Sequence, residues 1–299
     1  MNSASHCHVS RRHFLQTGSA AALGLAASAF AADKDKDKDS DPYGGFKLGV
    51  QSYTFRHFNT EQSLKRTKDL GLHYIEFYRD HAKPNSTPEQ VDALRHLCNS
   101  YGITPIAFGV ESFTKDHDHN RKLFEFGKRL GVKSLSADPQ PDSFDSLDKL
   151  VDEYKIAIAI HPHGPSGKRL HRWYSAEVIM AAVKDHHPLI GTCLDTGHLI
   201  RAAILGHKLD PVQEILTMGP RNFGIHLKDN DNEAEKRGSK DSNVVIGQGV
   251  LDVAAVLKAL RQVKFQGALS IEYESKEDEP SPDVKACVEV FKQEVKKLA

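Results

Sequence analysis

Cysteine is scarce in this sequence, and the few cysteines present are far apart. The 299 residues include four, of which Cys7 lies near the amino terminus and Cys98, Cys193 and Cys287 are widely separated, without a Cys-x-x-Cys pair. An odd and scattered set argues against both a disulfide framework and a zinc–thiolate site. We therefore predict that these last three are buried as small hydrophobic side chains.

Net charge and long apolar runs are lacking as well. Lys and Arg number 40, Asp and Glu number 40, and the formal net charge is +0. A balanced chain has no general electrostatic attraction for nucleic acid or for an anionic membrane surface, so we expect neither as a partner. The apolar segment 17–30 is too short and too rich in alanine for a membrane anchor. No cysteine follows it closely, so a lipid anchor is not expected either.

The first 45 residues are predicted to lie outside the folded domain. Arg11 and Arg12 precede the mildly apolar segment 17–30, and Ala29-Phe30-Ala31 has the small-x-small pattern of a cleavage site. This order is typical of a twin-arginine export signal, which predicts a signal peptide at 1–31 and a periplasmic protein. Residues 32–45 contain the tract DKDKDKDSD, which cannot bury enough apolar surface to fold, and are predicted to be a disordered charged linker.

From residue 46 to residue 299, short apolar runs alternate with helical patterns, and glycine often separates them. Eight runs have the length and composition of strands, and each is followed by at least one helical pattern. They are 46–53, 73–78, 103–110, 132–137, 156–160, 190–194, 222–227 and 268–273. This alternation predicts an α/β fold, a single (β/α)8 TIM barrel. A doubly wound open sheet is the alternative, but the first strand is not followed by its glycine-rich fingerprint.

Acids and histidines gather where the predicted strands end, whereas the strand bodies are apolar. The residues at these ends are Glu76, Asp138, His161, His163, Asp195, His198, His226, Lys228, Glu272 and Glu274. Each has an ordinary structural explanation when taken alone. His226 could be a hydrogen-bonded core histidine, Glu272 a salt bridge at the rim, and Asp195 with His198 a helix N-cap and its neighbour. Their joint placement favours a site, because parallel strands deliver their carboxyl ends to one face.

The residue types predict the chemistry of that site. Asp, His and Glu side chains from adjacent strands form a mixed oxygen and nitrogen donor set suited to a divalent ion such as Mn²⁺, Mg²⁺, Co²⁺ or Zn²⁺. Such an ion can hold adjacent oxygens of a substrate and stabilise an enediolate. Lys228 can supply a positive charge or a proton. Glu76 and Glu274 are candidate acid/base groups, with plain surface carboxylates as the alternative for both.

These residues stand in motifs that resemble those of a known family. The motifs are IAIHPHG at 158–164, CLDTGH at 193–198, HLKD at 226–229, GQG at 247–249 and SIEYE at 270–274. In this order they resemble the xylose isomerase-like TIM barrels, the sugar phosphate isomerases/epimerases, over nearly all of residues 46–299. The family also includes inosose dehydratases and, more distantly, apurinic endonucleases.

The resemblance implies a ligand set and catalytic residues. Asp195, His226 and Glu272 match three metal ligands of the family, and His161 stands where the family usually has a glutamate, so His161 is the fourth expected ligand. Glu272 also matches an acid/base glutamate, and His198 matches a residue that contacts substrate. The expected catalytic residues are therefore Glu272, His198, Lys228 and Glu76. The departure at His161 weakens the expectation of simple epimerisation, because a neutral imidazole does not replace the proton chemistry of a carboxylate.

The motifs leave several functions open. The first is a metal-dependent isomerase or epimerase of a small sugar or keto-sugar, unphosphorylated if the protein is exported. The second is a metal-dependent lyase or dehydratase acting on a keto-sugar or 3-keto-glycoside, in which an enolate expels a β substituent. A DNA-repair endonuclease is disfavoured by the export signal and the zero net charge. A non-catalytic sugar-binding barrel is the fourth hypothesis. The sequence does not decide the substrate, the metal or the oligomeric state.

Overall fold

Eight parallel strands form a closed barrel in the computed structural model, which describes residue 1, residues 41–239 and residues 241–298. Around the barrel the strand order is β1-β10-β7-β6-β5-β4-β3-β2, and β2 pairs with β1 to close it. The barrel strands are β1 (Leu48–Gln51), β2 (Tyr74–Phe77), β3 (Thr104–Phe113), β4 (Ser134–Pro139), β5 (Ala157–Ile160), β6 (Ile190–Asp195), β7 (Asn222–Leu227) and β10 (Ala268–Ile271). This arrangement confirms the predicted (β/α)8 barrel and rules out an open sheet.

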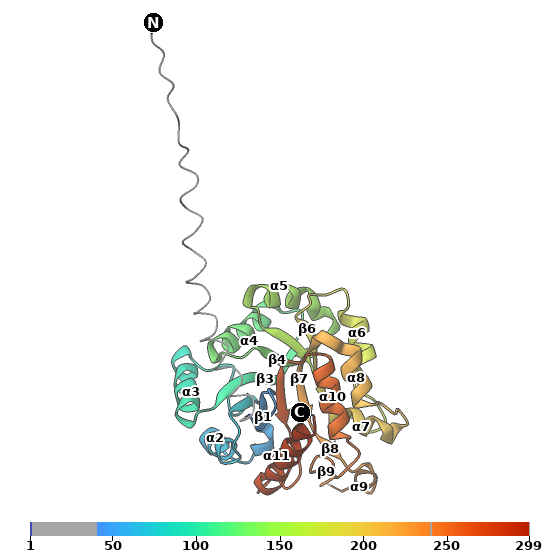
Figure 1. Ribbon diagram of the computed structural model, residues 1–299. Coiled ribbons are helices and arrows are strands. Elements are labelled where there is room, and N and C mark those ends of the chain that lie inside the picture. Colours follow the sequence, from blue (N-terminus) through green and yellow to red (C-terminus); the bar gives the residue numbers. More distant parts are fainter. Residues whose placement is uncertain (2–40, 240, 299) are drawn as a thin grey trace. The chain divides into compact units, whose positions relative to one another are not determined.

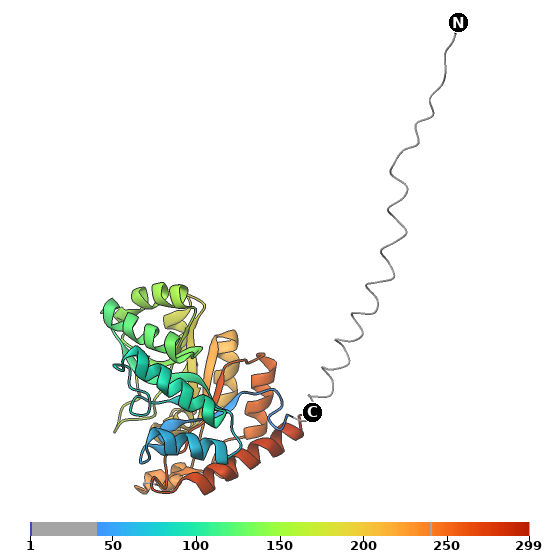
Figure 2. The same cartoon turned by 90° about the vertical axis from the view of Figure 1, so that its left-hand side faces the viewer.

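Helices lie outside the strands, as the two views in Figures 1 and 2 show. The α-helices are α2 (Thr60–Asp69), α3 (Pro88–Tyr101), α4 (His117–Leu130), α5 (Phe144–Tyr154), α6 (Ala176–Val183), α7 (Thr196–Arg201), α8 (Pro211–Met218), α9 (Asn232–Lys236), α10 (Val253–Gln262) and α11 (Ser281–Lys296). Short 3-10 helices cover Ser52–Phe55, Pro141–Ser143, Ala202–Leu205 and Gly219–Arg221. Phe46–Ala299 forms one compact unit.

Local sequence signals explain where several helices begin and end. The side chains of Asn59 and Thr87 each form a reciprocal capping box with the glutamine three residues later, at the starts of α2 and α3. Helix α3 ends at Gly102, whose φ of 70° is left-handed and therefore favours glycine. These signals fix the helix boundaries locally, before any packing against the barrel.

Two of the strands that carry the site, β5 and β6, are buried along their whole length. Every residue of β5 and of β6 is buried, which fits strands covered by the barrel interior on one face and by helices on the other. The three cysteines of the described region, Cys98, Cys193 and Cys287, are buried and free, as predicted. The complete burial of β5 and β6 holds the ends of these two strands in fixed positions.

Two segments differ from the sequence predictions. Helix α7 begins immediately after β6, with no connecting loop, because Asp195 is both the last residue of the strand and the N-cap of the helix. The polar segment 229–242, for which no helix or strand was predicted, contains helix α9, and its start, β8 (Asp229–Asn230), pairs antiparallel with β9 (Asn243–Val244). Both differences lie at the carboxyl end of the barrel.

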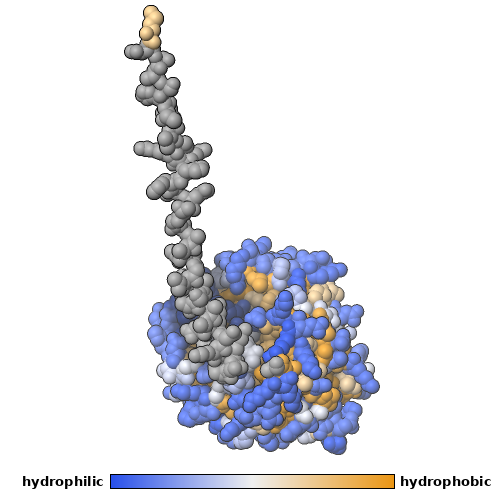
Figure 3. Space-filling view, in the orientation of Figure 1, coloured by the Kyte–Doolittle hydropathy of each residue, from blue (hydrophilic) through white to orange (hydrophobic). Residues whose placement is uncertain are grey.

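The amino-terminal predictions fall mostly outside the described residues. Apart from residue 1, the predicted signal peptide at 1–31 and most of the predicted linker at 32–45 belong to residues 2–40, which the structure does not describe. Hydrophilic residues predominate on the face of the molecule shown in Figure 3. Among the described helices, none combines the length and the apolar character needed to cross a membrane.

Candidate metal centre

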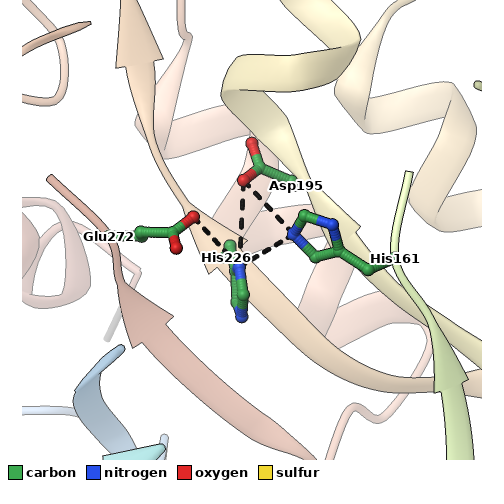
Figure 4. Close-up of side chains that lie close together, drawn as sticks. All are labelled: His161, Asp195, His226 and Glu272. Carbon is green, nitrogen blue, oxygen red and sulfur yellow. Dashed lines mark hydrogen bonds and ion pairs between the residues drawn. The ribbon is translucent and has the colours of Figure 1, made fainter. Parts of the chain in front are cut away.

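Four strands bring potential metal ligands together at the carboxyl end of the barrel. His161 follows β5, Asp195 ends β6, His226 lies near the end of β7, and Glu272 follows β10. One donor atom from each of the four lies within 4.8 Å of the others, and all four residues are buried. Figure 4 shows His161 and Glu272 approaching from opposite sides, with Asp195 and His226 between them. The structure thus brings together all four ligands expected from the sequence.

The distances among these atoms suit a shared cation. Nδ1 of His226 lies 3.0 Å from Nε2 of His161 and 3.2 Å from Oε2 of Glu272. Oδ2 of Asp195 is buried 3.5 Å from Nε2 of His161 and 3.0 Å from Nζ of Lys228, without hydrogen-bond geometry to either nitrogen. Two imidazole nitrogens and two carboxylate oxygens form a donor set that divalent ions such as Zn²⁺, Mn²⁺ and Co²⁺ accept. The residues present therefore fit a metal ion.

Asp195 performs two tasks with its two oxygens. Oδ1 accepts a hydrogen bond of 2.8 Å from the backbone N–H of His198 and so caps α7, whereas Oδ2 faces the cluster. The N-cap explanation and the ligand explanation of this residue are therefore compatible. Burial opposes ionisation, but the neighbouring side chains of His198, Lys228 and His161 outweigh it and hold the pKa of Asp195 well below its usual value.

Glu76 lies in the barrel interior behind His226 and does not line the cleft. Its Oε2 lies 3.0 Å from Nε2 of His226, and its two oxygens accept hydrogen bonds from the hydroxyls of Ser136 (2.6 Å) and Ser270 (2.8 Å). Burial raises the pKa of Glu76, but His226 and the two hydroxyls reverse this effect and the net shift is downward. An ionised carboxylate on one imidazole nitrogen orients the other nitrogen toward the cluster. The position of Glu76 thus suits orientation of His226.

Lys228 places an ammonium group against the same cluster. Its side chain is 3% exposed, and Nζ lies 2.6 Å from Oε2 of Glu272, 2.6 Å from Oε1 of Glu274 and 3.0 Å from Oδ2 of Asp195. Burial alone lowers the pKa of Lys228, but the three carboxylates outweigh it and raise the pKa well above its usual value. The same ion pair helps to hold the pKa of Glu272 below its usual value against the effect of burial. Lys228 is therefore protonated and carries a positive charge.

His198 stands at the edge of the cluster. Its Nε2 lies 3.8 Å from Oδ2 of Asp195, and its Nδ1 lies 3.3 Å from a guanidinium nitrogen of Arg201. Arg201 in turn forms an ion pair of 2.6 Å with Glu235 of α9. Burial and the nearby charge of Lys228 hold the pKa of His198 well below its usual value, although Asp195 opposes them. A neutral imidazole here can donate or accept a hydrogen bond to a ligand.

A cleft of about 370 Å³ opens above the cluster. It is lined by Gln51, Tyr53, Tyr78, Arg79, Gly109, Val110, His161, His163, His198, Glu272 and Glu274. The Tyr53 and Tyr78 rings meet edge to face with centroids 5.5 Å apart, and Tyr53 is 38% exposed. Tyr53, Tyr78 and Arg79 were not among the site residues predicted from the sequence. The signal for His163 was present, since it stands two residues beyond His161.

The motif Gly247-Gln248-Gly249 is explained by Asp229. The Asp229 carboxylate is fully buried and accepts five backbone N–H groups, from Asn230, Gly247, Gly249, Val250 and Leu251, at 2.8 to 2.9 Å. A Cβ at Gly249 would lie 2.6 Å from Oδ1 of Asp229, so only glycine allows this approach. One side chain thus fixes both ends of segment 229–251, directly after Lys228.

Comparison with known proteins agrees with the fold. The model of the family called Xylose isomerase-like TIM barrel matches residues 64–294. An inosose isomerase from Bacillus velezensis is 21% identical over 248 residues, which are 74% of this chain and 86% of that protein. The structure of an uncharacterized protein from Parabacteroides distasonis has a TM-score of 0.63 and 26% identity, covering 85% of this chain and all of that one.

An enzyme of stated activity has the same fold at lower identity. The structure of D-psicose 3-epimerase with D-tagatose from Clostridium cellulolyticum has a TM-score of 0.63 and 15% identity, and the match covers 84% of this chain and 99% of that one. Identity at this level shows a common fold and leaves the reaction of this chain to be argued from its site. By the family model, which covers more than two thirds of the sequence, the chain belongs to the xylose isomerase-like TIM barrel family.

Proposed function

We propose that the protein is a metal-dependent isomerase or epimerase of an unphosphorylated sugar or keto-sugar, acting through an enediolate-type intermediate. The observation that carries this proposal is the four-donor cluster beneath a cleft with tyrosine rings at its edge. Aromatic rings and convergent polar groups are the usual lining of a small-molecule site. The named activities of the inosose isomerase and the D-psicose 3-epimerase support the same reaction class.

The residues of this chain have distinct roles in the proposal. A bound divalent ion supplies Lewis acidity toward adjacent substrate oxygens. Glu272 borders the cleft as a carboxylate and is the candidate base for a proton next to a carbonyl group. Lys228 provides a positive charge 2.6 Å from Glu272, which favours negative charge developing on a substrate oxygen. His198 lines the cleft as a neutral imidazole and can hydrogen-bond a sugar hydroxyl.

A metal-dependent lyase or dehydratase is the second candidate, favoured by the histidines on the His161 side of the cleft. His161, His163 and His198 line the cleft there, where the family usually has a glutamate on β5. Burial and the neighbouring histidines lower the pKa of His163 to about 3, so this imidazole is neutral near pH 7. A site with one carboxylate base and imidazoles facing it suits removal of one proton followed by protonation of a leaving group.

One experiment separates the two reactions. Protein loaded with Mn²⁺, Mg²⁺, Co²⁺ or Zn²⁺ is incubated in D₂O with panels of keto-sugars and 3-keto-glycosides, and the products are followed by NMR and mass spectrometry. Deuterium incorporation without fragmentation supports an isomerase, and release of water or an aglycone supports a lyase. Sugar binding by a protein that holds no metal and exchanges no deuterium would instead support a non-catalytic barrel.

We also propose that residues 1–31 direct export through the twin-arginine pathway, which places the protein in the periplasm. The support is Arg11-Arg12 ahead of an alanine-rich segment and the small residues at 29 and 31. Cell fractionation and amino-terminal sequencing test this proposal. We expect a mature chain that begins after Ala31 in the periplasm, and retention in the cytoplasm when both arginines are changed to lysine. Export that survives this double change would contradict it.

A further inference from the structure

The backbone of Lys228 is held by the residue that follows Asp195. The hydroxyl of Thr196 accepts a hydrogen bond of 2.9 Å from the Lys228 N–H and donates one of 2.6 Å to the Lys228 carbonyl oxygen. Both groups are buried, so no water competes for these bonds. Thr196 therefore ties the start of α7 to the end of β7 at one residue.

The stem of Lys228 crosses Gly197. A Cβ at Gly197 would lie 2.6 Å from Cγ and 2.7 Å from Cδ of Lys228, closer than carbon atoms approach without a shift. Glycine is thus required here to give the lysine side chain its path toward the carboxylates. The Asp-Thr-Gly-His motif contains one residue that pairs with the ammonium, one that clamps the lysine backbone and one that makes room for its stem.

The Lys228 ammonium contacts two carboxylate oxygens that are also expected metal ligands. Oδ2 of Asp195 and Oε2 of Glu272 lie 3.0 Å and 2.6 Å from Nζ, and the same two atoms lie 3.8 Å and 3.2 Å from Nδ1 of His226. A carboxylate oxygen has lone pairs for two partners, but two cations on shared oxygens in a buried site repel each other strongly. The position of the Lys228 ammonium and the binding of a divalent ion are therefore expected to affect each other.

We propose that Lys228 is a built-in competitor of the metal ion, sharing Asp195 and Glu272 with it and thereby weakening the affinity of the centre for divalent cations. The proposal rests on the metal-dependent function proposed above. Without metal, the ammonium neutralises the buried carboxylates and keeps the ligands in place. With metal, Lys228 yields the two shared oxygens and keeps Glu274, its third partner.

Glu274 is suited to hold the displaced ammonium. Its Oε1 lies 2.6 Å from Nζ of Lys228, yet Glu274 is not among the four clustered ligands. Its side chain is 38% exposed and lines the cleft, so it has room to move with the lysine. Lys228 thus exchanges a three-carboxylate environment for a one-carboxylate environment when the ion enters, and this exchange opposes metal binding.

The decisive measurement is metal affinity, because its direction distinguishes competition from structural damage. We compare wild type with Lys228→Met, which keeps the length of the stem, by calorimetric titration with Mn²⁺ and Zn²⁺ and by chelator competition. Lys228→Met is expected to bind both ions at least about tenfold more tightly, since one repelling charge is removed. Lys285→Met, on the exposed face of α11, is the matched control and is expected to leave affinity unchanged.

A second variant tests the positioning role of Gly197. Gly197→Ala pushes the lysine stem aside without altering any charge. It is expected to tighten metal binding in wild type and to have no such effect in the Lys228→Met background. Damage to the fold would weaken binding in both backgrounds, and that result would overturn the positioning role.

The outcomes also separate this proposal from the function on which it rests. Unchanged or weaker metal binding by Lys228→Met, beside a wild type that binds metal, overturns the competition and leaves the metal-dependent function standing. Failure of both proteins to bind Mn²⁺ or Zn²⁺ overturns the metal site itself, and the competition with it. Metal binding by Lys228→Met alone would be the strongest form of the expected result.

Discussion

The two ends of the barrel have opposite chemistry. At the carboxyl end, Asp195, His226, Lys228 and Glu272 are buried against one another beneath the cleft. At the amino end, a cavity of about 470 Å³ is lined by apolar side chains such as Ile106, together with lysines and backbone. The amino-end cavity is larger than the cleft but contains no cluster of ligand-type side chains among the described residues.

This contrast shows which end of the barrel buries charged side chains despite the unfavourable free energy of removing them from water. Burying several charges is unfavourable unless each is paired, and replacing such pairs by apolar residues is often neutral or stabilising. The strand bodies are mostly apolar, whereas the carboxyl end of the barrel buries charged side chains. Selection for folding alone does not account for the buried charges at one end only, so their concentration there points to function.

The largest effect is expected from Asp195→Asn, which removes the negative charge of one expected ligand at the carboxyl end of the barrel. The amide oxygen can still cap the His198 N–H, but the group loses its charge and its strength as a ligand. We expect bound metal to fall sharply and deuterium exchange to drop by more than about a hundredfold, beyond the range for residues that only support a ligand. Asp210→Asn, which alters the N-cap of α8, is the control. Near-normal metal content in Asp195→Asn would remove this residue from the site.

Glu76→Gln tests whether a buried carboxylate that is not itself an expected ligand supports the four-ligand cluster through His226. The amide keeps the shape but loses the ionised partner of His226 Nε2. We expect metal affinity to fall by about ten- to a hundredfold, measured by chelator competition. Glu111→Gln provides the comparison, because Glu111 is also buried but pairs with Arg79. Equal losses in both variants would argue against a specific link between Glu76 and His226.

Ile106→Val tests the apolar end. Removing one methylene group beside the amino-end cavity is expected to lower the free energy of unfolding by about 0.5 to 1.5 kcal/mol, measured by urea denaturation. Metal affinity should stay at the wild-type value, since Ile106 lines the amino-end cavity and the ligands lie at the carboxyl end. A change in affinity beyond twofold would show that the two ends are coupled, and the comparison would then fail.

The smallest effect at neutral pH concerns the buried thiols of the helical shell. Burial raises the pKa of both Cys98 and Cys287 to about 12, so the neutral thiol is preferred in the folded protein. The two thiols therefore leave the free energy of unfolding unchanged below the ordinary thiol pKa near 9.0, and they lower it as the pH rises from there toward 12. The slope of the free energy of unfolding against pH corresponds to at most about one proton per thiol. Urea titrations at pH 7, 9 and 10 measure this, with Cys98→Ala expected to lessen the decline. A thiol reagent that modifies the native protein at pH 8 as quickly as the unfolded chain would contradict the burial.

The barrel and the convergence of its strand ends were predictable because both depend on local patterns. Eight apolar runs, their helix caps and the residues that end each run are readable from neighbouring positions in the chain. Helix α7 was anticipated only as the alternative in which Asp195 is a helix N-cap, because its six residues follow Asp195 directly, without a turn signal. The inward position of Glu76 depends on its contact with His226, 150 residues away, which no local pattern encodes.

The clamp formed by Asp229 has a consequence for divergence within the fold. A single carboxylate fastens both the start and the end of the excursion that contains α9, so the intervening residues can be lengthened, shortened or exchanged while the anchored ends remain fixed. Lys228, one residue before the clamp, would keep its position through such changes. New substrate preferences could therefore arise in this excursion without disturbing the charges beneath it.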